Sequence, residues 1–226
     1  MNKNFDVKQL TNLGIFTAII FAMLLLGIGF ITPIFSPFTI TTLQIPVIIG
    51  ASLLGWKQGA ILGGMFGLAS FINNSFIAMG PLSFAFTPFY SIPPDLQGAS
   101  VVPGGNFWSI VICFVPRIMV GVVAGLIFKL FANIPKTKMI AGGLAGFFGS
   151  LTNTILVLGG IFLFFGNDYS AVKSIIDINA GKTTIPVTMI DIILLTISTN
   201  GLLEIIASTI LCGIIIIPLI KVYKKD

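Results

Sequence analysis

One apolar segment with a single charge inside it places the strongest constraint on this chain. Residues 106–131 are long and apolar enough to cross a lipid bilayer, yet they contain Arg117, the only arginine in the sequence. Counted from Trp108 at about 1.5 Å per residue, Arg117 lies roughly 13 Å along a helix, near the bilayer midplane. A charge at that depth costs at least about 2.5 kcal/mol, so Arg117 should face the interior of a helix bundle and have a partner there.

The composition of the whole chain fits a membrane protein. Hydrophobic residues make up 56% of the 226 residues, charged residues make up 8%, and the mean hydropathy is +1.08. A soluble chain this apolar would expose large hydrophobic patches to water. The sequence therefore predicts an all-α, polytopic membrane protein that forms one transmembrane domain over residues 1–226.

The apolar runs predict six transmembrane helices. They cover residues 10–30, 43–55, 60–79, 106–131, 140–165 and a sixth run that enters the membrane near Leu194 and ends at Ile220. The second run is barely long enough, so it must be tilted, partly buried or extended by its flanks. The first run is too long for a signal peptide, so we expect it to be retained.

Three segments between these runs are predicted to be loops, namely residues 31–42, 80–105 and 166–186. The second of these is rich in proline and glycine and is long for a small membrane protein. Long loops often act as lids or binding elements, so residues 80–105 are a candidate for such a role.

The lysines predict the orientation of the helices. With six spans, the lysines next to the spans all fall on one side: Lys3, Lys8, Lys57, Lys129, Lys136, Lys138, Lys221, Lys224 and Lys225. The opposite loops carry no basic excess. Basic residues gather on the cytoplasmic side, so we expect both termini in the cytoplasm of a cell whose plasma membrane holds this chain. This bias explains the net charge of +5, which gives no argument for nucleic acid.

Arg117 has two interpretations. A buried guanidinium offers a rigid set of donors that suits a carboxylate or a phosphate, which would make it a substrate-binding residue. It could instead pair with Glu204, the one acid deep in the sixth span. Charges inside a membrane mark functional sites by default, which favours the first interpretation. Glu204 could otherwise serve the inner half of the protein or a partner interface.

Several asparagines lie within or near apolar spans, among them Asn74, Asn153 and Asn200. Amides in a membrane must find partners. Hydrogen bonds between helices are one explanation, and a polar pocket shared around Arg117 is the other. We favour the pocket for Asn74 and Asn153, and retain Asn200 as a further candidate.

Aromatic residues gather near the predicted outer face, among them Phe86, Tyr90 and Trp108. They could form an aromatic belt at the membrane interface. They could also form an apolar lid over a binding site. Both interpretations stay open, and Tyr90 and Trp108 are candidate substrate-binding residues.

The first span carries a face of small residues. Gly14, Ala18 and Ala22 recur at every fourth position, which lets another helix approach closely. This face could pack inside the bundle or receive a different subunit, and spacing alone does not separate the two.

Absent motifs exclude several functions. There is no histidine, and no G-x-x-x-x-G-K-[ST] loop for ATP. Zinc-protease, Ser-His-Asp and Cys-His mechanisms are excluded, and we expect no catalytic residues, cofactor or metal. Cys113 and Cys212 are predicted to be small core residues. Six spans also fall short of a secondary transporter with two inverted repeats.

The chain resembles the substrate-binding S-components of energy-coupling factor (ECF) vitamin transporters. The resemblance rests on size and topology and on the Ala18-x-x-x-Ala22 face, which in that family docks on a membrane coupling subunit. It rests also on residues 43–70, LQIPVIIGASLLGWKQGAILGGMFGLAS, which are similar to the family's short second helix, tight turn and glycine-rich third helix.

The resemblance implies a function. An S-component captures a water-soluble vitamin from outside, docks on the membrane coupling subunit with its two cytosolic ATPase subunits, and topples to release the vitamin inside. It would be part of an ABC importer, and ATP hydrolysis would belong to the partners, so the chain itself would not be an enzyme.

Within that family the chain is most similar to the pantothenate-type members. The similarity lies in PRIMVGVVAGLIF and GSLTNTILVLGG, where an arginine and an asparagine are expected at the binding site, matching Arg117 and Asn153. The carboxylate of pantothenate would suit Arg117. Folate also has carboxylates and riboflavin is neutral, so both remain alternatives.

Two other classes of function compete with this interpretation. One is a small ion-coupled carrier in which Arg117, Asp191 and Glu204 relay charge. The other is an intramembrane enzyme, which is less favoured because no nucleophile–base pair is visible.

Overall fold

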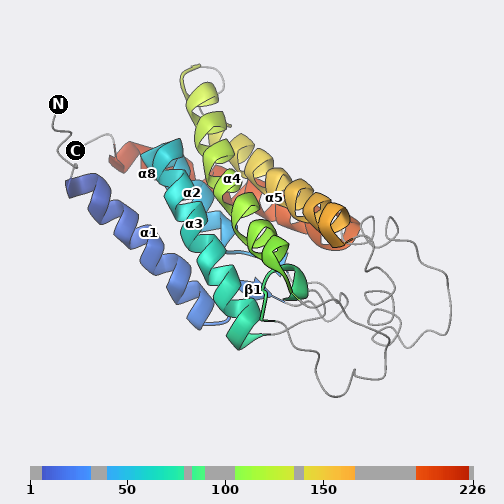
Figure 1. Ribbon diagram of the computed structural model, residues 1–226. Helices are drawn as coiled ribbons and strands as arrows, with labels where there is room; N and C mark the ends of the chain where they lie inside the picture. The colour runs from blue at the N-terminus through green and yellow to red at the C-terminus, as the bar shows by residue number, and fades with distance from the viewer. Residues whose placement is uncertain are drawn as a thin grey trace, which may run out of the picture.

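A computed structural model shows a bundle of helices and describes residues 7–31, 40–78, 83–89, 105–134, 140–165 and 197–223 (Figure 1). The predicted loop at residues 166–186 and the candidate residues Tyr90 and Asp191 lie outside these ranges. The elements are α1 (Val7–Leu25), β1 (Phe30–Ile31), β2 (Ile40–Thr41), α2 (Gln44–Leu54), α3 (Trp56–Ile72), η1 (Asn73–Ile77), η2 (Ser83–Ala85), α4 (Phe107–Ala132), α5 (Ala141–Phe165), η5 (Ile197–Gly201) and α8 (Leu202–Tyr223).

Among the described residues, five helices are long and apolar enough to cross a membrane: α1, α3 together with η1, α4, α5 and α8. The prediction of a helical membrane protein is confirmed for these five. The predicted second span is also a helix, α2, but its 11 residues cover only roughly 16 Å. A sixth crossing and the side on which the termini lie stay predictions.

The first helix is shorter than predicted. It ends at Leu25 because Gly27 takes a positive φ of 71°, which turns the chain. Phe30 and Ile31 then pair with Thr41 and Ile40 in a two-stranded antiparallel hairpin. The apolar residues up to Phe30 predict a longer helix, because apolarity does not distinguish a strand from a helix end.

The helices surround the short helix α2, most of whose residues are buried. Figure 1 shows α1, α3, α4 and α5 side by side, with α8 passing behind α4 and α5. α2 contacts α1, α3, α4, α5 and α8, and its Val47 and Ile48 join Leu62, Val120 and Ile216 in the apolar core. The first turn of α1 and the last turn of α8 lie at one end of the bundle, and the β hairpin lies toward the other, here called the hairpin end.

Helices α3 and α4 pack through glycines. A Cβ atom on Gly63 would collide with the backbone carbonyl of Arg117, and one on Gly59 would collide with the carbonyl of Gly121. Small residues at this spacing let two helix backbones approach closely. The contact fixes the position of α4, and therefore of Arg117, against α3.

Replacing Gly63 by alanine should therefore destabilise the protein. The added methyl group must push the two backbones apart, and overpacking of this kind costs about 1–3 kcal/mol. Thermal unfolding of the detergent-purified protein measures the effect as a lowered melting temperature. Gly64→Ala is the matched control, because a Cβ at Gly64 meets no atom within 4 Å. Equal melting temperatures for the two variants would refute the close contact.

Candidate functional site

Helix α4 places Arg117 inside the bundle, where its side chain is only 4% exposed. The residue before it, Pro116, has no backbone N–H and so leaves the carbonyl of Ile112 without its usual helical donor. Nη1 of Arg117 donates to that carbonyl at 2.9 Å. The proline and the arginine therefore act together, since one frees an acceptor and the other uses it to fix its guanidinium.

Two aromatic rings flank the guanidinium of Arg117. Its Cζ atom lies 4.7 Å from the ring centroid of Phe86 and 5.6 Å from that of Phe66 in α3. Such contacts stabilise a buried cation without using its hydrogen-bond donors. Nε of Arg117 is buried and has no hydrogen-bond partner among the described residues. The group is thus oriented and still has donor capacity for a carboxylate.

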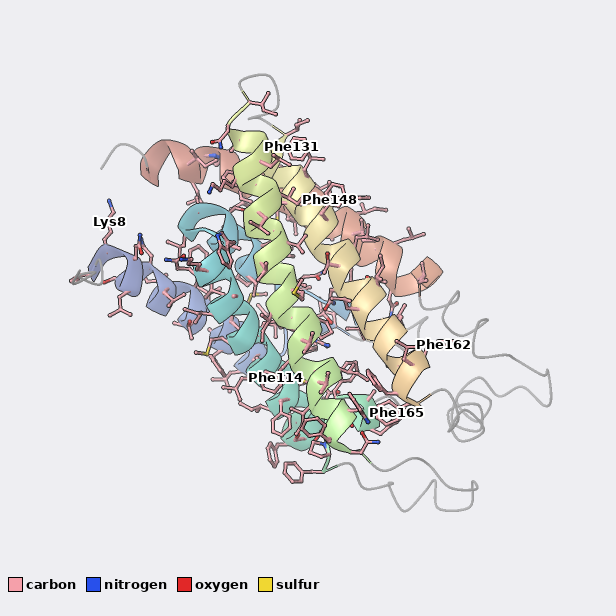
Figure 2. All side chains as sticks on the ribbon, turned by 45° about the horizontal axis from the view of Figure 1, so that its top comes forward. Lys8, Phe114, Phe131, Phe148, Phe162 and Phe165 are labelled. Carbon is pink, nitrogen blue, oxygen red and sulfur yellow. The ribbon has the colours of Figure 1, made fainter. Side chains whose placement is uncertain are left out.

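The segment at residues 83–89 holds Phe86 in place through hydrogen bonds at the hairpin end. Ser75 Oγ donates to Thr87 Oγ1 at 2.7 Å, and Ser109 Oγ donates to the carbonyl of Phe84 at 2.6 Å. Phe84 also packs edge-on against Phe165, with ring centroids 5.2 Å apart. Phe165 lies at the end of α5 (Figure 2). This segment is therefore tied to η1, α4 and α5.

Glu204 lies in the first turn of α8 and is 7% exposed. Its Oε1 accepts a hydrogen bond from the backbone N–H of Thr41 in β2 at 2.6 Å. Within the described part of the chain it makes no ion pair with Arg117, although the two opposite charges attract each other over a longer distance. Glu204 is therefore buried and held against the hairpin, and its assignment to the inner half of the protein or to a partner interface stays a prediction.

A buried glutamine that the sequence analysis missed connects three helices. Nε2 of Gln44, in the first turn of α2, donates at 3.1 Å to Ser150 Oγ of α5 and at 3.1 Å to Ser208 Oγ of α8. Its Oε1 is buried without a hydrogen-bond partner among the described residues. Gln44 is an amide within the apolar run 43–55, and this isolated polar residue is the feature of the sequence that indicates a buried polar role.

The predicted asparagines divide into two groups. Asn153 lies one turn beyond Ser150 on α5 and is 5% exposed, and Asn200 in η5 is 4% exposed. Oδ1 of Asn153 and both polar atoms of the Asn200 amide have no partner in the described ranges. Asn74 differs, because its Nδ2 donates to the carbonyl of Ser70 at 2.8 Å and its Oδ1 accepts from Ser83 Oγ at 2.9 Å. Asn74 thus positions the 83–89 segment.

We call the buried side chains with unpartnered polar atoms the polar cluster: Gln44, Ser70, Arg117, Asn153 and Asn200. They come from five elements, namely α2, α3, α4, α5 and η5. An unsatisfied buried polar atom costs about 1–3 kcal/mol, so each of these side chains is a candidate for contact with a polar ligand. Arg117 supplies positive charge and the amides supply both donors and acceptors, which suits an acid that also carries uncharged polar groups.

Trp108 is separated from the polar cluster. It lies half a turn round α4 from Arg117, is 43% exposed and stacks on Phe164 with ring centroids 4.0 Å apart. The structure brings Phe86 to Arg117 and leaves Trp108 on the outer surface, as an aromatic belt requires. An aromatic residue near the end of a predicted span is compatible with an aromatic belt and with a lid over a binding site, so the sequence alone did not separate the two.

The face of Gly14, Ala18 and Ala22 points away from the bundle. All three residues are exposed, and a Cβ built on Gly14 would meet no atom within 4 Å. The alternative that this face packs inside the bundle is therefore wrong. Figure 2 shows this helix through Lys8 in its first turn, which lies at the opposite side of the bundle from Phe165 at the end of α5.

Comparison with known proteins gives two matches. A family model described as "ECF transporter, substrate-specific component" matches residues 95–216. The chain is also 38% identical over 93 residues to the pantothenic acid transporter PanT of Lactococcus lactis subsp. cremoris. That match covers 41% of this chain and 43% of the relative, so the chain spans less than half the length of that protein.

Proposed function

This chain belongs to the family of ECF transporter substrate-specific components, and from this membership we propose that it captures pantothenate for an ECF-type importer. The family match and the five apolar helices make it a multi-pass protein of the cell membrane that serves transport. The vitamin, the contacts that bind it and the partner subunits are what we propose here.

The observation that carries the choice of substrate is the oriented, buried guanidinium of Arg117, whose Nε has no partner among the described residues. A site of this kind suits a ligand with a carboxylate. Pantothenate has one, and its amide and hydroxyl groups suit Asn153, Asn200 and the rest of the polar cluster. The pantothenic acid transporter that matches part of this chain supports the same choice. Folate is the alternative with carboxylates, and riboflavin lacks one.

The exposed face of α1 supports a role as a docking subunit. We assign Gly14, Ala18 and Ala22 to contact with a membrane coupling subunit, because small side chains allow two helices to approach closely. Two cytosolic ATPase subunits would then supply ATP hydrolysis.

Binding of vitamins to the detergent-purified chain alone tests the proposal. We expect pantothenate to bind tightly and saturably in calorimetry and to raise the melting temperature, because a ligand of the folded state stabilises it in proportion to the logarithm of its concentration over Kd. Folate and riboflavin are the comparison ligands.

The outcomes separate the alternatives. If folate binds tightly and pantothenate does not, the chain is still a vitamin-capture subunit, but its substrate is folate. No binding by protein shown to be folded would contradict the proposal and favour the ion-coupled carrier, whose uptake should collapse with an uncoupler while ATP persists.

A further inference from the structure

The amide of Gln44 is held by two hydroxyl groups and is almost fully buried, with 1% of the residue exposed. Its Nε2 carries two N–H bonds and has two acceptors, Ser150 Oγ and Ser208 Oγ, each at 3.1 Å. Both serines are themselves buried. The donor capacity of the amide is therefore used completely by the protein.

The same two hydrogen bonds fix the direction of the amide oxygen. An amide is planar, so Oε1 must point away from the side on which the serines hold Nε2. This oxygen is buried and has no hydrogen-bond partner in the described part of the chain. Leaving a buried acceptor unsatisfied costs about as much as a whole hydrogen bond contributes. A side chain whose role was only to tie α2 to α5 and α8 would lose to that cost about the contribution of one of its two hydrogen bonds.

The two serines connect Gln44 to helix positions next to other buried polar side chains. Ser150 lies one turn before Asn153 on α5, and Ser208 lies one turn after Glu204 on α8. In the proposed function, Arg117 binds the carboxylate of the ligand. The oxygen of Gln44 is a neutral acceptor, which can bind only a group that carries a hydrogen.

We infer that Gln44 determines specificity by accepting a hydrogen bond from a hydroxyl or amide N–H on the uncharged part of the substrate. The inference rests on the proposed function, since it concerns the ligand that Arg117 binds. It defines the ligand class as an acid with a donor group away from its carboxylate.

The test measures binding preference. Calorimetry compares pantothenate with analogues in which one hydroxyl at a time is replaced by hydrogen, and with the analogue whose amide N–H is methylated. We expect the wild-type chain to bind pantothenate roughly ten- to a hundredfold more tightly than one of these analogues. Gln44→Met removes the acceptor and nearly keeps the shape, so it should lose that preference while its affinity for the analogue stays the same.

Two further variants make the result specific. Gln58→Met is the matched control, because Gln58 is an amide on α3 whose partner is the exposed Gln9, and both affinities should be unchanged. Ser208→Ala removes one of the two groups that orient the amide and should weaken the same preference partially. If Gln44→Met does not fold, the binding preference of Ser208→Ala tests the inference in its place.

Two results would overturn the inference. If Gln44→Met and Ser208→Ala weaken all ligands by one common factor, Gln44 is a structural tie only. If the wild-type chain binds pantothenate but no variant changes the preference, the role of Gln44 is refuted and the proposed function stands. Absence of pantothenate binding by the folded wild-type chain refutes the cargo, and this assignment with it.

Discussion

Replacing Arg117 by alanine should abolish pantothenate binding while the protein still folds. The guanidinium is buried and oriented by the carbonyl of Ile112 and the ring of Phe86, so it is ready to bind a carboxylate. Removing one partner of a buried charged pair costs about 2–5 kcal/mol, which corresponds to roughly a thirty- to several-thousandfold loss of affinity. The fold should tolerate the change, because the variant also no longer has to bury a charge.

Calorimetry on the detergent-purified variant measures this loss, and its melting temperature without ligand reports whether it folds. Arg117→Lys keeps the charge but not the planar fork of donors, so we expect it to bind more weakly than wild type and more tightly than Arg117→Ala. Lys129→Ala removes a positive charge from the exposed last turn of the same helix and should leave affinity unchanged. An unaltered affinity in Arg117→Ala would exclude this residue from the binding site.

Replacing Ala18 by tryptophan should stop transport and leave vitamin binding intact. Ala18 lies in the middle of the exposed small-residue face of α1, and the indole ring would hold a docking helix away from it. The polar cluster involves α2, α3, α4, α5 and η5, not α1. Capture and transport should therefore separate in this variant.

Uptake of labelled pantothenate into cells that contain the coupling and ATPase subunits measures transport, and calorimetry on the purified chain measures binding. The matched control is Ile206→Trp, which places the same ring on an exposed position of α8 outside the proposed docking face. We expect normal uptake by the control and none by Ala18→Trp. Normal uptake by both variants would remove the docking role from this face.

The sequence by itself determined the class of the protein and most of its helices. Long runs of apolar residues predict membrane helices because the cost of placing a chain in hydrocarbon is a sum over local residues. The same reasoning placed Arg117 inside the bundle, since an isolated charge cannot face lipid. Asn153 and Asn200 were likewise found to be buried, as polar side chains within apolar runs should be.

Only the tertiary structure decided which side chains meet. Glu204 binds the backbone of Thr41, Gln44 joins two serines far away in sequence, and Phe86 rather than Trp108 covers Arg117. The tertiary structure also decided that the face of α1 with Ala18 points away from the bundle. Each of these depends on how helices rotate and pack against one another. Spacing within one helix fixes which residues share a face, and the neighbouring helices alone determine what that face contacts.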